Sequence, residues 1–221
     1  MKKFLTLFCL INLYVITAQA QGIVWDSSSD RRLTFLKGVN HMNVEYIYDG
    51  VMINGKSEAE FLDTRQEEFN DKKKGRGDNF VEHWQEVKLK RYPDHFEKAF
   101  KRMAKKSMKI ARGDNDKYTM QVKLIKAKTG EGIIVKNVPA NAEFEISFID
   151  TETGKVMAKA RILNAKGIVK AKTNLGTQGS IMRVVASSMN TDVANRLAKC
   201  YESAATSMAK YVIRFNKKKK K

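Results

Sequence analysis

The sequence has 221 residues, of which 43% are hydrophobic and only two are proline, a composition that favours a globular chain and excludes a largely disordered one. Its 42 Lys and Arg residues outnumber 24 Asp and Glu residues, so the formal net charge is +18. This excess predicts attraction to polyanions such as anionic lipid head groups, acidic glycans or nucleic acid, but it does not determine the fold.

The first twenty residues have the pattern of a secretory signal peptide. Lys2 and Lys3 precede an apolar run over residues 4–16. Ala18 and Ala20 then place small residues at the positions that a signal peptidase reads. The run would span roughly 20 Å as a helix, less than the roughly 30 Å hydrocarbon core of a bilayer. We therefore expect cleavage after Ala20, export, and a product of net charge +16 with no transmembrane span, because two of the 42 basic residues leave with the signal.

Cysteine usage excludes an intrachain disulfide in the exported product. Cys9 lies in the apolar run, and residues 6–8 before it lack the small residue that precedes a lipidated bacterial cysteine, which disfavours a lipoprotein. Cys200 then remains alone on the apolar face of a predicted helix. We interpret it as a buried, inert thiol, and a reactive thiol or an intermolecular bridge is the alternative.

After the signal peptide the chain is expected to form one domain. Residues 21–40 have mixed character and indicate a loosely packed lead-in. Residues 41–215 are predicted to form a single α/β envelope domain, long enough to bury a core, and residues 216–221 form a basic lysine tail.

The first half of this domain predicts a strand and then a helix. Apolar and polar side chains alternate over residues 44–48, which is typical of a half-buried strand. Ser57 and Glu60 have the spacing of a capping box, so an acidic helix should follow to about Phe69. A polar loop that contains glycine is expected over residues 71–79.

The next helices contain the sharpest functional candidate. Residues 80–92 are predicted to be helical, with Pro93 interrupting the helix and Asp94 capping a second helix over residues 94–112. The second helix is amphipathic, with apolar residues on one face and cations on the other. Its candidate contacts to an anionic surface are Lys98, Lys101, Arg102, Lys105, Lys109 and Arg112. The alternative is that the apolar face docks on a sheet and the cations are only solvated.

The second half predicts strands and a long closing helix. Alternation predicts strands over residues 118–124, 144–148 and 156–162, the last two forming an antiparallel hairpin. Residues 164–179 have a loop-like composition, and residues 193–215 keep the apolar spacing of a helix. We expect an α+β fold with α/β-like layering, in which helices cover one antiparallel or mixed sheet of about four or five strands. The long C-terminal helix should pack on that sheet.

No motif in the sequence predicts catalysis, a cofactor or a metal. His41, His83 and His95 belong to no His-Glu-x-x-His pattern, and no cysteine pair is available for zinc. Residues 114–116 begin like a calcium loop but lack the glycine and glutamate that such a loop needs further on, so a turn is the better interpretation. We therefore expect a protein that is not an enzyme, with no cofactor and no metal site.

Several stretches, read together, carry a family resemblance: Gly75-Arg76-Gly77-Asp78 with Trp84, Arg91-Tyr92-Pro93-Asp94-His95-Phe96 with Phe100, Lys117-Tyr118-Thr119-Met120, residues 143–149, and the helix around Arg196, Tyr201 and Lys210. In these stretches the chain resembles a group of uncharacterised exported proteins of the Bacteroidota. Its layout is also distantly similar to the amino-terminal domain of TolB and to curli-secretion lipoproteins, in which helices pack on a mixed sheet. The resemblance implies a periplasmic or outer-membrane-associated, non-catalytic role and assigns no catalytic residue.

Export and charge together favour an envelope binding or assembly protein. Export removes most nucleic acid from reach, so the expected partners are anionic lipid or lipopolysaccharide and envelope proteins. One alternative is a protein that binds nucleic acid through its cations, although no aromatic residue is interleaved with them to stack bases. Another is an exported hydrolase with an unrecognised site. The sequence does not determine the oligomeric state.

Overall fold

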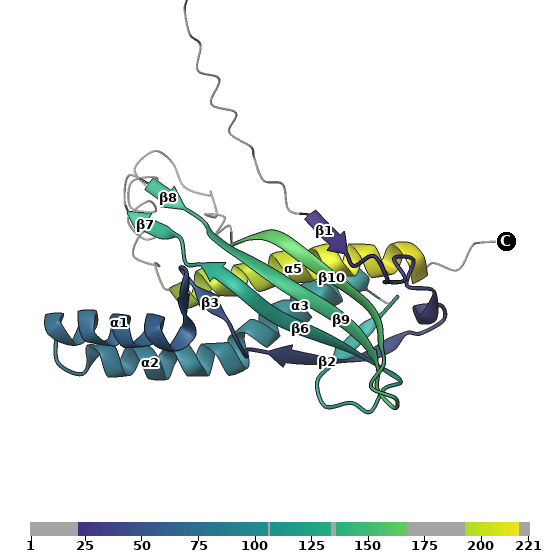
Figure 1. Ribbon diagram of the computed structural model, residues 1–221, viewed down its shortest axis with the longest axis horizontal. Helices are drawn as coiled ribbons and strands as arrows, with labels where there is room; N and C mark the ends of the chain where they lie inside the picture. The colour runs from purple at the N-terminus through teal and green to yellow at the C-terminus, as the bar shows by residue number, and fades with distance from the viewer. Residues whose placement is uncertain (1–21, 106, 134–135, 168–192, 217–221) are drawn as a thin grey trace, which may run out of the picture.

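The computed structural model describes residues 22–105, 107–133, 136–167 and 193–216 (Figure 1). The predicted signal peptide lies outside these residues, and so does the predicted lysine tail except for Asn216, the last residue of α5. The helices are η1 (Thr34–Leu36, a 3-10 turn), α1 (Glu58–Lys72), α2 (Arg76–Glu86), η2 (Val87–Arg91, a π-helical turn), α3 (Tyr92–Ala104) and α5 (Val193–Asn216). The strands are β1 (Gly22–Trp25), β2 (His41–Ile47), β3 (Met52–Ile53), β4 (Lys56–Ser57), β5 (Lys109–Ala111), β6 (Tyr118–Lys128), β7 (Glu131–Ile133), β8 (Lys136–Val138), β9 (Ala140–Asp150) and β10 (Val156–Gly167).

The strands form one mixed eight-stranded sheet and a separate hairpin of β7 and β8. The main order is β1-β10-β9-β6-β2-β5, and β3 pairs with β6 and β4. β2 runs parallel to β5 and β6, whereas β6, β9, β10 and β1 pair antiparallel. The α+β class is confirmed, but four or five strands is too few. The strands that were not predicted, β1, β3, β4 and β5, have only two to four residues each. An alternation of apolar and polar side chains cannot be recognised over so few residues.

The segment before β2 is packed, which corrects the expected loose lead-in. β1 pairs with β10 from Gly22 to Trp25, and the Trp25 ring lies 4.7 Å from the Tyr211 ring of α5. Leu33 and Leu36 are fully buried. Pairing with β10 satisfies backbone N–H and C=O groups on both strands. Because the partner residues lie some 140 positions away, the sequence pattern around β1 does not predict this pairing.

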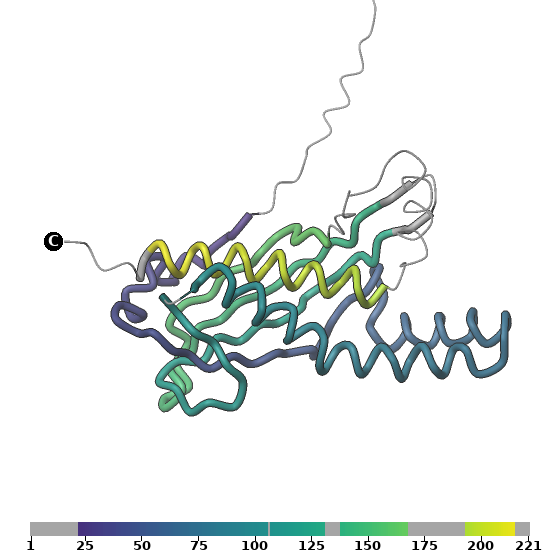
Figure 2. Tube along the Cα trace, turned by 180° about the vertical axis from the view of Figure 1, so that it is seen from behind, coloured from purple at the N-terminus to yellow at the C-terminus, as the bar shows by residue number. Residues whose placement is uncertain are grey.

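Helices α3 and α5 lie side by side on one face of the sheet (Figures 1 and 2). The inward side chains of β9, among them Phe144 and Phe148, are fully buried beneath them. Tyr201 of α5 packs edge-on against Phe144 at 4.7 Å and stacks on Tyr92 of α3 at 4.8 Å. These rings join both helices to the sheet, and the predicted packing of the C-terminal helix on the sheet is confirmed.

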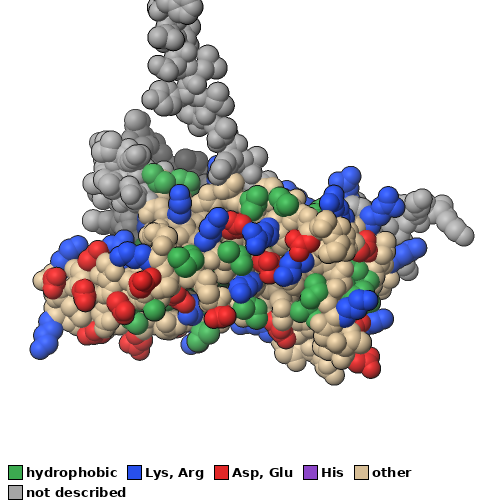
Figure 3. Space-filling view, viewed as in Figure 1, with side chains coloured by type: hydrophobic (Ala, Val, Ile, Leu, Met, Phe, Trp, Pro, Cys, Tyr) green, Lys and Arg blue, Asp and Glu red, His purple; other side chains and the backbone are tan. Residues whose placement is uncertain are grey.

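The opposite face of the sheet has ion pairs between neighbouring strands. Lys126 pairs with Glu143 at 2.7 Å, and Lys159 pairs with Glu145 at 3.1 Å. Arg161 lies within 4.0 Å of both glutamates. Figure 3 shows basic and acidic side chains interspersed on this face. Opposite charges on adjacent strands stabilise their pairing modestly.

Helices α1 and α2 form a hairpin that projects beyond the sheet (Figure 1). The predicted capping box is confirmed, because the Glu60 N–H donates to the Ser57 side chain and the Ser57 N–H donates to the Glu60 carboxylate. The loop expected over residues 71–79 is shorter, because α1 continues to Lys72 and α2 begins at Arg76. Gly77 allows α2 to pack closely against α1, since a Cβ at this position would lie 2.0 Å from the carbonyl oxygen of Gln66.

Pro93 does not interrupt the helix, which corrects the predicted break with Asp94 as a cap. α2, η2 and α3 follow one another without a gap. Pro93 has no N–H to offer the carbonyl of Leu89, four residues earlier, and its ring crowds that carbonyl. In η2 the N–H of Tyr92 donates to the carbonyl of Val87, five residues earlier, so a wider turn accommodates the proline. Asp94 instead pairs with Arg112 at 2.9 Å.

Cys200 is fully buried where α5 packs against the end of β10, as expected. Its Sγ donates to the carbonyl oxygen of Arg196 at 3.6 Å. Burial raises the pKa of this thiol from its ordinary value of 9.0 to about 12, an effect only partly offset by a hydrogen bond from Gly167. A protonated, enclosed thiol is a poor nucleophile.

We expect Cys200 to resist a thiol reagent at pH 8 until the chain unfolds. In a Cys9→Ser background, labelling in buffer should be slow, and labelling in concentrated urea should be complete. Since the folded pKa lies above the unfolded value, the thiol's contribution to stability is full below pH 9 and is lost as pH rises towards 12. A Cys200→Ala variant should lack that alkaline loss, and rapid labelling of the native protein would contradict the burial.

Candidate anion-binding surface

The basic segment predicted as one helix is divided between a helix and a strand. α3 ends at Ala104, and Lys105 adopts a φ of +52° that cannot continue the helix. The N–H of Lys109 instead donates to the carbonyl of Asn40 at 2.8 Å as β5 pairs with β2. This pairing overrides the helical pattern, so the prediction of a helix to residue 112 is wrong. The candidate cations therefore lie on α3 (Lys98, Lys101 and Arg102), at its end (Lys105), in β5 (Lys109) and after it (Arg112).

Four of the predicted cations still share one exposed strip of surface, the cationic stripe, made of Lys98, Lys101, Arg102 and Lys105. Lys101 and Arg102 follow Lys98 by three and four residues, which places these three on one side of α3, and Lys105 comes directly after the end of the helix. All four side chains are exposed. Within the part of the chain that the structure describes, none has a carboxylate within ion-pair distance, so their positive charge is not compensated locally.

Arg112, by contrast, serves to fasten β5 to α3. Its guanidinium lies 2.9 Å from Asp94 and 2.8 Å from Glu97, both on α3. Burial raises the pKa of Glu97, although Arg112 and the hydroxyl of Tyr46 oppose this shift. Arg112 is exposed, but these two carboxylates balance its charge, so it adds little to the positive field of the surface.

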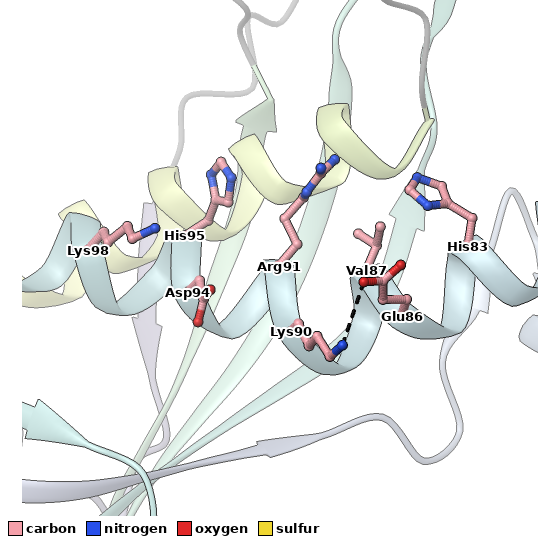
Figure 4. A pocket seen from close by; sticks show the side chains of 8 residues that line it. All are labelled: His83, Glu86, Val87, Lys90, Arg91, Asp94, His95 and Lys98. Carbon is pink, nitrogen blue, oxygen red and sulfur yellow. Dashed lines mark ion pairs between the residues drawn. The ribbon is translucent and has the colours of Figure 1, made fainter.

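Lys98 also borders a shallow groove along the helix, the helix groove, with a volume of about 270 Å³. Figure 4 shows His83, Arg91 and His95 pointing from the helix towards α5, while Lys90 points away and reaches Glu86. The residues that line the groove are His83, Glu86, Val87, Lys90, Arg91, Asp94, His95 and Lys98.

The π-helical turn brings His83 and Arg91 to the same side of the helix. Eight residues of regular α-helix, at 100° each, would leave these two side chains about 80° apart around the axis. Residues of a π turn advance by a smaller angle, so η2 reduces the separation. Sequence reasoning placed His83 and Arg91 in one helix, over residues 80–92, but it did not predict the π turn that aligns them. The available signal was Pro93, because a proline inside a helix favours a wider turn just before it.

Side chains of α5 hold two of the groove's side chains in place. Arg91 donates to the Oδ1 atom of Asn195 at 2.5 Å. The Nδ1 atom of His95 lies 2.6 Å from Oε1 of Glu202, which also accepts from Lys199 at 2.7 Å. Burial alone would raise the pKa of Glu202, but the hydrogen bonds from Lys199 and His95 lower it. The inner wall of the groove is therefore a fixed polar network, and its outer end opens onto the cationic stripe at Lys98.

A second surface feature is the open edge of β2. β5 pairs only with residues 41–43, whereas β2 continues to Ile47. The carbonyl of Asn40 accepts a hydrogen bond from β5 on this edge. Backbone N–H and C=O groups point to alternate sides of a strand from one residue to the next, so those of Tyr46, six residues on, point to the same edge. No described strand pairs with β2 there. A cavity of about 480 Å³ beside this edge is lined in part by Tyr48 and the exposed Leu89. Such an edge can accept a further strand.

Comparison with known proteins does not place the chain in a family. No known family model matches the sequence, and no curated protein matches it. Two solved structures show limited similarity, a dodecamer of PelC from Paraburkholderia phytofirmans and a dodecamer of a PelC point variant from the same organism. Their identities to this chain are 9% and 10%, with TM-scores of 0.36 and 0.37. Each match covers 90% of this chain and 100% of the PelC chain.

None of the helices in the described part of the chain is both long enough and apolar enough to cross a membrane.

Proposed function

We propose that this chain is an exported, periplasmic or outer-membrane-associated binding or assembly protein that holds an anionic component of the cell envelope on its cationic stripe. One observation carries the proposal: four exposed cations, three on one side of α3 and one directly after its end, have no carboxylate partner among the described residues. The signal pattern in the first twenty residues supports export. The proposal requires no reaction and no cofactor.

The contrast between the two faces of the protein supports this surface over others. On the open face of the sheet, Lys126 and Lys159 each pair with a glutamate on a neighbouring strand, and Arg161 lies within 4.0 Å of the same two glutamates. Among the described residues the cationic stripe has no such ion pairs, so its field extends into solvent and attracts anions. A basic side chain held near an anionic membrane surface gains about 1 kcal/mol, so a stripe of this size gains several.

The side chains around the stripe favour phosphate head groups over nucleic acid. Lysine ammonium groups bind phosphate as compact point charges. The aromatic residues of α3, Tyr92, Phe96 and Phe100, are fully buried and cannot stack a base. Anionic phospholipid or lipopolysaccharide therefore fits the stripe better than a single-stranded nucleic acid does.

Vesicle sedimentation tests the proposed surface directly. We expect a Lys98→Gln, Lys101→Gln, Lys105→Gln variant to bind phosphatidylglycerol vesicles on the order of 100-fold more weakly than the natural chain at low salt, from about 1 kcal/mol for each lysine. All three side chains are exposed, so far-UV circular dichroism should not change. Binding of the natural chain should weaken steeply as salt is added.

A charge-matched control separates this site from a general effect of net charge. Lys72, Lys73 and Lys74 are exposed at the tip of the α1–α2 hairpin, and their replacement by Gln removes the same charge elsewhere. This control should keep most of the vesicle binding. Equal losses in both variants would show that net charge alone drives binding. No binding by the natural chain at low salt would overturn the membrane-surface proposal.

A further inference from the structure

His41 meets two carboxylates that follow β5. His41 is the first residue of β2, and Asp114 and Asp116 lie in the loop that leads from β5 to β6. The Nδ1 atom of His41 lies 2.6 Å from Oδ2 of Asp116, and its Nε2 atom lies 3.5 Å from Oδ2 of Asp114. One donor atom from each residue lies within 4.8 Å of the others. The parallel pairing of β2 with both β5 and β6 brings these groups together.

Buried contacts fix the loop independently of these three side chains. The N–H of Gly113 donates to Oδ1 of the buried Asn43 at 3.1 Å. The same asparagine donates from Nδ2 to the hydroxyl of Thr119 at 3.1 Å, and that hydroxyl lies 2.9 Å from the hydroxyl of Thr151. Asn43 thus ties the start of the loop, at Gly113, to the core next to Asp114.

The two carboxylates that face His41 carry more negative charge than the side chains around them balance. In the described ranges, no lysine or arginine forms an ion pair with Asp114 or Asp116. Even a protonated His41 would leave one negative charge in excess, and a neutral imidazole would leave two. A divalent cation would neutralise this excess, and Asp114 is about half exposed, so an ion can reach it from solvent.

The donors are those of a transition-metal site. We propose that His41 and Asp114 bind one divalent transition-metal ion, Zn²⁺ being the best match, with Nε2 of His41 and a carboxylate oxygen of Asp114 as ligands and water completing the coordination. Asp116 accepts from Nδ1 and orients the imidazole, an arrangement that also makes the ring a better ligand. Imidazole and carboxylate are common zinc ligands. The ligands are too far apart in sequence to form a recognisable motif.

Calorimetric titration with ZnCl₂ tests this site. The full chain should bind one equivalent, and both His41→Gln and Asp114→Asn should abolish that binding. Asp116→Asn should weaken it by about 10- to 100-fold, as expected for a residue that only orients a ligand. Because Asp114 is exposed, Asp114→Asn gives a readout even if His41→Gln disturbs the start of β2.

His95→Gln is the matched control. This histidine also faces a carboxylate, Glu202, but in the helix groove. The control should keep one equivalent of Zn²⁺. The proposal is overturned if the natural chain binds no Zn²⁺, if His41→Gln and Asp114→Asn keep the binding, or if His95→Gln removes it.

Discussion

Replacing Tyr201 by Ala should destabilise the protein by about 3–5 kcal/mol, the usual cost of removing a large buried aromatic side chain. Tyr201 is fully buried and contacts the rings of Tyr92 on α3 and Phe144 on β9. Its removal would leave a cavity where both helices meet the sheet. A domain of ordinary stability, about 5–15 kcal/mol, would lose a large part of its margin.

Urea unfolding followed by far-UV circular dichroism measures this loss. Leu89→Ala is a suitable control, because Leu89 is a large apolar residue of which 60% is exposed. We expect the control to change the free energy of unfolding by less than about 0.5 kcal/mol. A Tyr201→Ala variant as stable as the control would show that α5 does not pack on the sheet in this way.

Gly167→Ala should cost about 3 kcal/mol, at the upper end of the range for overpacking. A Cβ at this position would lie 2.2 Å from the carbonyl oxygen of Arg196 and 3.1 Å from Sγ of Cys200. Both contacts belong to α5, and the closer one is backbone, which cannot turn aside. The end of β10 and α5 must therefore separate to admit one methyl group.

Two readouts distinguish this separation from a general loss of stability. The unfolding midpoint in urea should fall, and Cys200 of α5 should become faster to label in buffer because the end of β10 no longer packs closely against it. Gly22→Ala provides the control, since a Cβ on Gly22 would meet nothing within 4 Å. Unchanged labelling and stability in Gly167→Ala would contradict the close packing of α5 on β10.

The proposed anion surface and the proposed metal site can fail independently. The cationic stripe follows the exposed side of α3, whereas His41, Asp114 and Asp116 lie where β2 begins beside the β5–β6 loop. The vesicle experiment removes lysines that the metal site does not use. The zinc titration removes a histidine and a carboxylate that the stripe does not contain. Neither result therefore predetermines the other.

The sequence by itself determined the long, regular elements. Alternation over residues 118–124, 144–148 and 156–162 predicted the cores of β6, β9 and β10, and the apolar spacing of residues 193–215 predicted α5. These patterns are local, because a side chain's face depends only on its position along its own strand or helix. The capping box at Ser57 was equally readable, since both of its hydrogen bonds join residues three positions apart.

The tertiary structure alone decided the short elements and the convergence of distant side chains. Lys109 belongs to β5 rather than to a helix because β2 offers backbone partners there, and Pro93 is tolerated because η2 widens the helix. Likewise, His41 meets Asp114 only because β2 pairs in parallel with the strands on either side of that loop. Such outcomes depend on hydrogen bonds and packing between residues far apart in sequence, which can outweigh the modest local preference of a short segment.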